Sequence, residues 1–188
     1  MYELIVIGVS VGGMQALSRL LPALPDDYKI PVAIVQHIGA NNNNNYLPSY
    51  YSKICQLAVT WASPTMPITE GHIYFAPPGY HLLVENDRTF SLSVDDSVNH
   101  SRPSIDVLFD SAAHVFCEKL VGVILTGASS DGSKGLRNIK NHDGLTLVQD
   151  PDEAEVDTMP RAAIEAVGVD KTFSLNELKL LLVDLQNE

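Results

Sequence analysis

The sequence predicts an α/β fold: a doubly wound, mostly parallel sheet with helices on both faces and an inserted β-hairpin or meander at about residues 71–94. Three observations support this prediction. Short, wholly apolar segments recur along the chain, which is typical of strands buried on both faces. Amphipathic helical segments alternate with them, as the crossovers between parallel strands require. The middle of the chain alternates short β-forming runs with turn residues, which is typical of antiparallel hairpins.

The first half of the chain contains two of these buried strands. Residues 3–8 form a continuous apolar run that ends in glycine, and residues 31–36 form a second run. Apolar side chains recur at helical spacing over residues 12–21, and the prolines and aspartates that follow end this helix. The region 46–57 fits a helix whose start is confined by a proline. Residues 41–45, all asparagine, are predicted to be a polar loop.

The middle of the chain is rich in β-forming residues. Three short runs occupy residues 71–76, 80–84 and 90–94. They are separated by turn-forming stretches at residues 77–79 and 85–88, so the sequence predicts a hairpin or meander inserted into the α/β plan.

From residue 104 to residue 186 the chain returns to alternating strands and helices. Strands are expected at residues 120–125 and 145–149. Helices are expected at residues 104–116, 133–140, 159–166 and 174–186. The last helix begins with a capping box, in which Ser174 and Glu177 satisfy each other's main-chain N–H groups.

The composition excludes several classes of protein. The chain has 188 residues, of which 45% are hydrophobic and 19% charged, so it is not mostly disordered and holds one domain or two small ones. Its longest apolar stretches are far too short to span a bilayer. A net charge of -11 disfavours nucleic-acid binding, because a protein that follows phosphates is usually basic.

The chain is expected to be cytoplasmic. Its N-terminus carries Glu3 and no basic region, so no signal peptide is expected. Cys55 and Cys117 form no motif, which favours a reducing compartment.

A candidate nucleophile follows the first predicted strand. Residues 8–12 fit the pattern G-x-S-x-G, which places the Ser10 hydroxyl on a tight turn between a strand and a helix. The helix N-terminus and the main-chain N–H of Val11 are placed to stabilise an oxyanion. The alternative is that Ser10 only caps the helix.

Two further reactive side chains follow buried strands. His37 comes directly after the strand at residues 31–36, and Asp131 lies in the turn after the strand at residues 120–125. A neutral imidazole can take a proton from a serine, and a carboxylate can orient that imidazole. Each has an alternative role, His37 as a structural histidine and Asp131 as a helix cap or turn residue. Because the carboxyl ends of parallel strands meet at one edge, a Ser-His-Asp triad is the favoured interpretation.

The order of the three residues along the chain excludes the best-known serine hydrolase folds. The order Ser, His, Asp differs from that of the α/β-hydrolases, of chymotrypsin and of subtilisin. Ser10 also follows the first strand, whereas several strands precede the nucleophile in α/β-hydrolases.

At this point the sequence resembles the catalytic domain of the CheB family of chemotaxis protein-glutamate methylesterases. The similar segments occur in the family's order and extend over most of the chain. They are residues 6–17 (VIGVSVGGMQAL), 36–37 (QH), 73–77 (IYFAP), 101–109 (SRPSIDVLF), 121–127 (VGVILTG) with 131–132 (DG), and 159–161 (MPR).

The resemblance implies roles for the three reactive residues: Ser10 as nucleophile, His37 as general base and Asp131 as its partner. The family hydrolyses glutamate γ-methyl esters on chemoreceptors, and many members also deamidate receptor glutamines. The implied partners are therefore methylated cytoplasmic helices of chemoreceptors, with no cofactor and no metal. The candidates for oxyanion or substrate binding are Val11, Gly12, Ala128, Met159 and Arg161.

The sequence departs from the family pattern in four places. Members typically carry a receiver domain before the catalytic domain, whereas residues 1–188 are predicted to be a single catalytic domain, which a receiver would regulate in trans. Val11 replaces a threonine, so a main-chain oxyanion contact is kept and a hydroxyl contact is lost. Residues 127–130 lack the family's large side chain, which predicts a wider cleft. Residues 150–157 are acidic and form either a solvated loop or a segment that repels acidic receptor helices.

The sequence leaves two rival functions open. One is the hydrolysis of another ester or amide on the same scaffold. The other is a non-catalytic module that binds a receptor, a receiver or another signalling partner. A nicotinamide enzyme is disfavoured, because Gly8, Gly12 and Gly13 do not form G-x-G-x-x-G.

Overall fold

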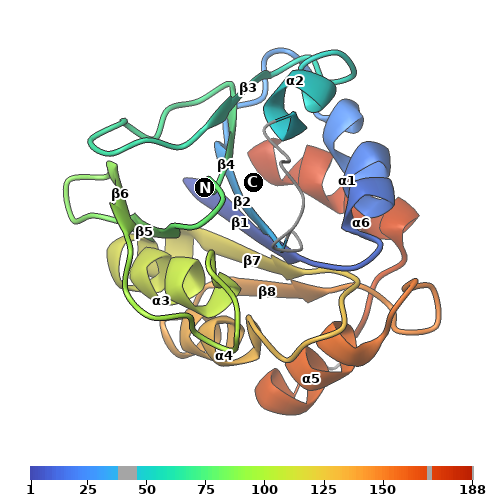
Figure 1. Cartoon of the computed structure of the whole chain (residues 1–188). Coiled ribbons are helices and arrows are strands. Elements are labelled where there is room, and N and C mark those ends of the chain that lie inside the picture. The colour runs from blue at the N-terminus through green and yellow to red at the C-terminus, as the bar shows by residue number, and fades with distance from the viewer. Residues whose placement is uncertain (38–45, 169–170, 188) are drawn as a thin grey trace.

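A six-stranded parallel sheet forms the centre of the molecule, as a computed structural model shows for residues 1–37, 46–168 and 171–187 (Figure 1). The strands of this sheet lie in the order β3-β4-β2-β1-β7-β8. Their bounds are β1 (Leu4–Val9), β2 (Val32–Gln36), β3 (Ala58–Trp61), β4 (His72–Phe75), β7 (Leu120–Ile124) and β8 (Leu145–Val148). The remaining strands, β5 (His81–Val84) and β6 (Phe90–Ser93), pair with each other as an antiparallel hairpin.

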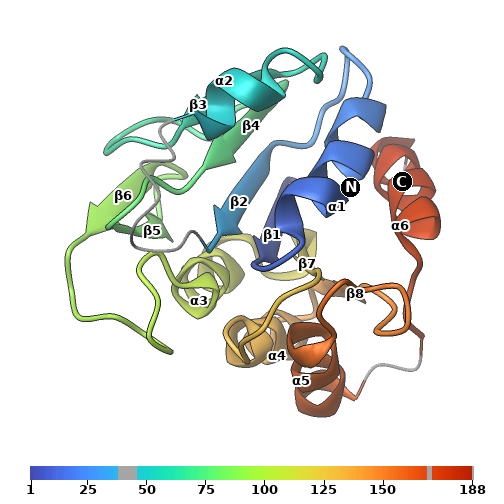
Figure 2. The ribbon, with the colours of Figure 1, turned by 45° about the vertical axis from the view of Figure 1, so that its right-hand side comes forward.

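Helices cover both faces of the parallel sheet. The α-helices are α1 (Gly13–Leu20), α2 (Leu47–Tyr51), α3 (Ile105–Phe116), α4 (Ser133–Asn141), α5 (Thr158–Val167) and α6 (Leu175–Asp184). Short 3₁₀ turns occupy Leu21–Ala23, Cys117–Lys119 and Leu185–Asn187. Figure 2 shows α1 and α6 together on one side of the sheet and α3, α4 and α5 on the other.

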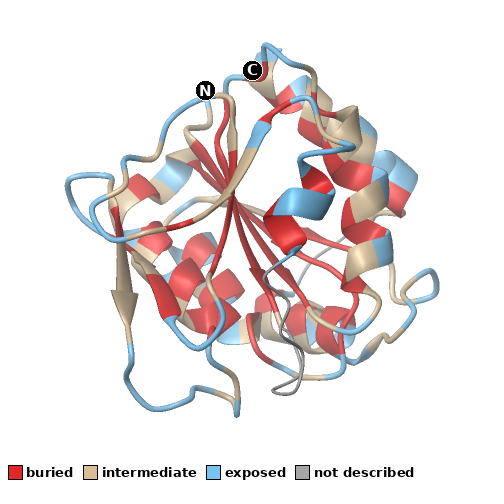
Figure 3. Ribbon diagram, turned by 45° about the horizontal axis from the view of Figure 1, so that its top comes forward, coloured by how far each residue is buried: buried red, intermediate tan, exposed pale blue. Residues whose placement is uncertain are grey.

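The sheet separates two hydrophobic cores. On β1, Ile5 and Ile7 face the core shared with α1, α2 and α6, and Leu4 and Val6 face the core shared with α3, α4, α5 and the hairpin. Alternate residues of a strand point to opposite faces, so β1 must be apolar throughout to fill both cores. Figure 3 shows the strands as buried segments between the helices. The predicted doubly wound α/β fold is therefore confirmed.

The inserted hairpin is smaller than the sequence predicts. The segment 71–94 was expected to form one insertion, but β4 belongs to the parallel sheet, where Ile73 pairs with Val32 of β2 and Val59 of β3. Only β5 and β6 form the hairpin. Short β-forming runs bounded by turns are alike in both kinds of sheet, so the pattern did not indicate which sheet β4 joins.

The region after α2 also differs from the expectation. The helix expected over residues 46–57 ends at Tyr51, and β3 was not predicted. β3 pairs only with β4 at the edge of the sheet, and its side chains are partly exposed. An edge strand does not need a continuous apolar run, so it lacks the pattern by which the inner strands were identified. The predicted loop at residues 41–45 lies outside the described residues.

The helices after residue 104 agree with the prediction. The capping box of α6 is present: Ser174 Oγ accepts from the main-chain N–H of Glu177, and Glu177 Oε2 accepts from the main-chain N–H of Ser174. In the part of the chain that the structure describes, no helix is long and apolar enough to cross a membrane.

The face that α6 buries can be tested with two leucines two positions apart. Leu178 is 0% exposed in the core shared with α1, and Leu180 is 63% exposed. We expect Leu178→Ala to lower the free energy of unfolding by about 2–5 kcal/mol, because it leaves a cavity. We expect Leu180→Ala to change the same quantity by less than about 0.5 kcal/mol. Urea denaturation followed by circular dichroism measures both, and equal losses in the two variants would contradict this packing.

Candidate active site

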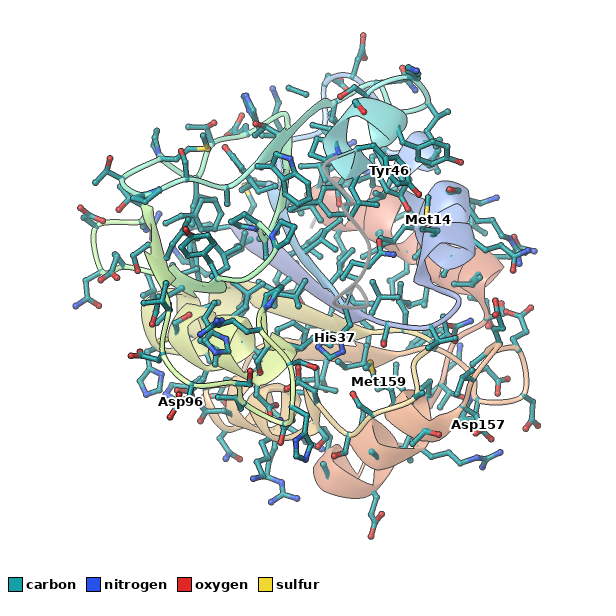
Figure 4. All side chains as sticks on the ribbon, in the orientation of Figure 1. Met14, His37, Tyr46, Asp96, Asp157 and Met159 are labelled. Carbon is teal, nitrogen blue, oxygen red and sulfur yellow. The ribbon has the colours of Figure 1, made fainter. Side chains whose placement is uncertain are left out.

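The predicted site residues lie where the direction of the sheet's connections changes. The chain leaves β1 through α1 on one face and leaves β7 through α4 on the other, so a crevice opens at the carboxyl ends of these neighbouring strands. Main-chain hydrogen bonds tie the three loops together: Ser10 N donates to Thr126 O over 3.0 Å and His37 N donates to Val9 O over 2.9 Å. Figure 4 shows His37 at this edge of the sheet.

A tight turn carries Ser10 from β1 to α1. Gly13 N donates to Ser10 O over 3.0 Å, and Gly12 between them has a φ of 80°. This left-handed backbone favours glycine at position 12. The N-cap of α1 is Gly12 and no side chain caps the helix, so the structure does not support the alternative role of Ser10 as a helix cap. The partly positive end of α1 is consequently left without a side-chain acceptor beside Ser10.

The imidazole of His37 is held by Asp131. His37 Nε2 and Asp131 Oδ2 are 2.8 Å apart, and their side chains are 11% and 0% exposed. Because Nε2 is engaged by the carboxylate, Nδ1 is the ring nitrogen left to exchange a proton with a substrate or a hydroxyl. No hydrogen bond joins Ser10 Oγ to His37 among the described residues, although the bond from His37 N to Val9 O holds His37 next to the residue that precedes Ser10.

Donors surround the carboxylate of Asp131 at the N-terminus of α3. Oδ1 accepts from Ser104 Oγ and Asn99 Nδ2, each over 2.8 Å. The first main-chain N–H groups of α3 complete the set: Ile105 N donates to Oδ2 over 2.6 Å and Asp106 N donates to Oδ1 over 3.2 Å. Burial acts to raise the pKa of Asp131, but the hydrogen bonds from His37, Asn99, Ile105 and Ser104 outweigh it and hold the pKa below its ordinary value. Asp131 is therefore an ionised group beside His37.

A second carboxylate lies behind the first. Asp106 is 8% exposed and accepts from Gly135 N over 2.7 Å and from Asn99 Nδ2 over 2.8 Å. Burial raises the pKa of Asp106, and the charge of Asp131 raises it further, against the opposing hydrogen bonds. The two carboxyl groups are thus shifted in opposite directions by their surroundings.

Met159 closes the site behind Ser10. Gly127 N donates to Val156 O over 3.0 Å and Met159 N donates to Gly127 O over 2.9 Å, so the start of α5 is bound to the loop after β7. A Cβ atom on Gly127 would lie 2.6 Å from Met159 Cε and 2.8 Å from Ser10 Cβ. This close approach requires glycine at position 127 and brings the thioether of Met159 next to Ser10.

The further predicted residues divide into two groups. Gly12 and Met159 lie beside Ser10, and Val11 is 47% exposed on the turn that follows it. Ala128 is exposed in the loop after β7. Arg161 is paired elsewhere: its guanidinium bonds Asp157 over 2.6 Å and lies 3.6 Å from Asp152. The structure therefore places the charge of Arg161 on the acidic segment and gives it no contact with His37 or Asp131 among the described residues.

A hollow of about 380 Å³ opens next to Ser10. Ser10, Met14 and Gln36 line it, together with Glu155 from the acidic segment. A carboxylate in this position makes the hollow less favourable for anions than for neutral or cationic groups. No group of three or more His, Cys, Asp or Glu side chains is arranged to hold a metal ion among the described residues.

The sequence did not indicate the donors to Asp131. Asn99 lies 32 residues before Asp131 and Ser104 lies 27 residues before it, so no local spacing connects them. One signal was present, since Ser104 precedes a helix start and a helix N-terminus attracts a carboxylate. That signal predicts an anion at α3 without naming Asp131.

Comparison with known proteins identifies the family of the chain. The sequence model of the CheB methylesterase family matches residues 5–182. The chain belongs to the CheB methylesterase family. Its fold matches the crystal structure of the CheB methylesterase catalytic domain of Thermotoga maritima with a TM-score of 0.92 and 30% identity, over 98% of this chain and 99% of that one.

Curated relatives agree with this assignment. A putative protein-glutamate methylesterase/protein-glutamine glutaminase of Leptospira interrogans is 50% identical over 98% of this chain and 95% of its own length. A protein-glutamate methylesterase/protein-glutamine glutaminase of Anaeromyxobacter dehalogenans is 38% identical over 97% of this chain. The chain spans 53% of the latter relative. The CheB-type enzyme class and the fold expected from the sequence are thus confirmed.

The ionised state of Asp131 leads to a stability prediction. We expect Asp131→Asn to lower the free energy of unfolding at pH 7 by about 2–4 kcal/mol, because the amide leaves donors at the start of α3 unmatched. The pKa of Asp131 is lower in the folded than in the unfolded state, where it is about 3.9. Its contribution is therefore present above this value and lost as the pH falls through the folded-state pKa.

The measurement is urea denaturation of the parent and Asp131→Asn from pH 7 to pH 3. The difference in free energy of unfolding between the parent and Asp131→Asn should be largest near neutral pH and should become smaller below about pH 4. Asp110→Asn is the control, because Asp110 is exposed and accepts from Asn138 on the outer surface of α3 and α4. A gap for Asp131→Asn that is independent of pH would contradict the ionised assignment.

Proposed function

We propose that this chain hydrolyses the γ-methyl esters of glutamate side chains on chemoreceptors, with Ser10 as nucleophile, His37 as general base and Asp131 as its partner. The 2.8 Å hydrogen bond between His37 and the buried Asp131 carries the proposal, since it orients an imidazole beside a serine on a strand-end turn. Membership in the CheB methylesterase family supports the same reaction.

The first half of the reaction forms an acyl-enzyme. Ser10 Oγ attacks the ester carbonyl carbon while His37 Nδ1 takes the hydroxyl proton. The carbonyl oxygen becomes an oxyanion, and the proposed donors to it are the main-chain N–H groups of Val11 and Gly12; the start of α1, which no side chain caps, supports this choice. The C–O bond to the methoxy group then breaks, and the imidazolium returns the proton so that methanol leaves.

The second half releases the glutamate. His37 takes a proton from water, the resulting hydroxide attacks the acyl carbon, and the bond to Ser10 Oγ breaks with return of the proton to that oxygen. Asp131 stays ionised throughout and stabilises the positive imidazolium that forms in each half. The products are a glutamate carboxylate and methanol, and no cofactor takes part.

The other predicted residues support this reaction unequally. Met159 provides an apolar wall behind Ser10, and Ala128 leaves the loop after β7 without a large side chain. Arg161 fits substrate binding less well, because its charge is already paired with Asp152 and Asp157. We therefore assign Arg161 to the folding of the acidic segment.

The same site also suits an amide substrate. The relatives from Leptospira and Anaeromyxobacter are named for a glutaminase activity as well as for the methylesterase. A glutamine side chain would give the same acyl-enzyme, with His37 donating the proton to ammonia in place of methanol. Deamidation of receptor glutamines is thus a second proposed activity of Ser10.

The proposed partners are the methylated cytoplasmic helices of chemoreceptors, in the cytoplasm. A receiver domain that acts in trans is the proposed regulator of this catalytic domain, which the family model matches over residues 5–182. The net charge of -11 and Glu155 in the hollow favour the approach of neutral or basic segments of a receptor.

The proposed reaction predicts the loss of turnover in two variants. Ser10→Ala and His37→Ala should each lower methanol release from methylated receptors by several orders of magnitude, up to about 10⁶-fold, because the triad acts as a unit. Intact-mass analysis after a fluorophosphonate probe should give one adduct on the parent and none on either variant. Ser133→Ala is the control, since Ser133 Oγ bonds Ser130 O at the start of α4.

The outcomes separate the proposed function from its rivals. An adduct at Ser10 without methanol release would favour the hydrolysis of another ester or amide, which substrate profiling would then identify. No adduct on the folded parent would overturn the triad and favour a non-catalytic module that binds a signalling partner.

A further inference from the structure

We propose that Asn99 is a positioning residue of the active site: its side-chain amide fixes the carboxylate of Asp131 and so sets the proton affinity of His37. This inference rests on the function proposed above. Among the described residues Asn99 makes no hydrogen bond to His37, and its effect passes through Asp131, which both residues bond.

The amide nitrogen of Asn99 joins two buried carboxylates. Nδ2 donates to Asp131 Oδ1 and to Asp106 Oδ2, each over 2.8 Å. An amide nitrogen carries two hydrogens, and both are used here. Asp131 is 0% exposed and Asp106 is 8% exposed, so water does not replace these bonds easily.

The two carboxylates need a donor between them. Burial raises the pKa of Asp106, and the negative charge of Asp131 nearby raises it further. Each also has its own donors, His37 and Ser104 for Asp131 and Gly135 for Asp106. These other donors serve one carboxylate each, whereas Asn99 bonds both and so fixes the position of one relative to the other.

The surroundings of the pair come from several elements. His37 follows β2, the N–H groups of Ile105 and Asp106 begin α3, and Gly135 lies on α4. Lys134 and Asp110 line the surface hollow outside Asn99 and Asp106. Among the described residues, the titratable groups bonded to Asp131 or lying next to it are His37 and Asp106, with Lys134 and Asp110 farther out. Buried His81 of β5 accepts from Ser104 N over 3.1 Å and so reaches Asp131 only through Ser104.

A two-residue turn carries Asn99. Val98 and Ser101 exchange main-chain hydrogen bonds of 3.1 and 2.9 Å across a two-residue turn in which Asn99 has φ 50° and His100 has φ 63°. Glycine suits this left-handed backbone best, and asparagine tolerates it. Asparagine is a favoured residue in such a turn, so the positioning role rests on the contacts of its amide with Asp131 and Asp106.

Removing the amide has a definite electrostatic consequence. Asp131 keeps its bonds to Ser104 and α3 but loses one donor, so its carboxylate becomes more basic. A more basic carboxylate holds the shared proton of His37 more strongly and stabilises the imidazolium. The acid limb of the activity profile, where His37 becomes protonated, should then move to higher pH.

The deletion variant is Asn99→Gly, because glycine removes the amide and keeps the left-handed turn unstrained. With p-nitrophenyl acetate as the probe substrate, kcat should fall about 10- to 100-fold, while KM stays within about twofold of the parent value. The midpoint of the acid limb of the kcat profile should move up by about one pH unit. Asn99→Asp keeps the size of the side chain but replaces the donor with a carboxylate, so both changes should be larger. Urea denaturation confirms that each variant is folded.

The matched control is Asn138→Ala. Asn138 Nδ2 donates to Asp110 Oδ1 over 2.6 Å, which is also an asparagine-aspartate bond between neighbouring elements of the α3 and α4 layer. Loss of this bond should leave kcat within about twofold of the parent value and the midpoint of the acid limb within about 0.2 pH units, because Asp110 is exposed on the outer surface of α3. Equal behaviour of Asn99→Gly and Asn138→Ala would overturn the proposal.

A second readout keeps this test separate from the proposed function. The imidazole resonances of His37 are followed by NMR from pH 4 to pH 9 in the parent, Asn99→Gly and Asn138→Ala, which needs no turnover. A higher titration midpoint in Asn99→Gly alone supports the role of Asn99 even if methanol release from receptors fails. An unchanged midpoint overturns it even if the parent is a methylesterase.

Discussion

The buried charge of Asp131 is the constraint on which the site depends. An ionised carboxylate without exposure to water is tolerated only when donors surround it, and here they come from three parts of the chain: His37, Asn99 and the start of α3. α3 must begin at Ile105 so that its first N–H groups point at the carboxylate. The turn at Asn99 must fold back over the same atoms. The stability of this corner and the orientation of His37 are therefore two results of one arrangement.

The parallel sheet supplies the other half of the geometry. β1 lies between β2 and β7 in register, so the residues that follow these three strands emerge side by side. Beyond the last residues of the strands, two main-chain hydrogen bonds hold the loops in place. One joins Ser10 to Thr126 and the other joins His37 to Val9. The serine and histidine are thus placed by rigid elements, which suits a group that must meet a substrate carbonyl within a fraction of an ångström.

The parts of the structure that the sequence revealed are those with a repeating physical cause. Inner strands such as β1 must be apolar on both faces, and helices such as α3 must be apolar on one, so their positions follow from periodicity. β3 was not predicted from the sequence, because a strand at the edge of the sheet does not need to be apolar on both faces. Ser10, His37 and Asp131 were found because each follows an inner strand. Asn99 was missed because a two-residue turn carries no periodicity, and its partner Asp131 is 32 residues away.

The charges around the site suit a reaction that converts a neutral group into an anion. A glutamate methyl ester is uncharged, whereas its product is a carboxylate. Glu155 lines the hollow beside Ser10, while Arg161, the nearby cation of the same acidic region, is paired with Asp152 and Asp157. On the proposed function the ester lies next to this hollow, where the carboxylate of Glu155 repels a carboxylate product more than it repels the uncharged ester. In the proposed reaction, this repulsion favours release of the product after each turnover.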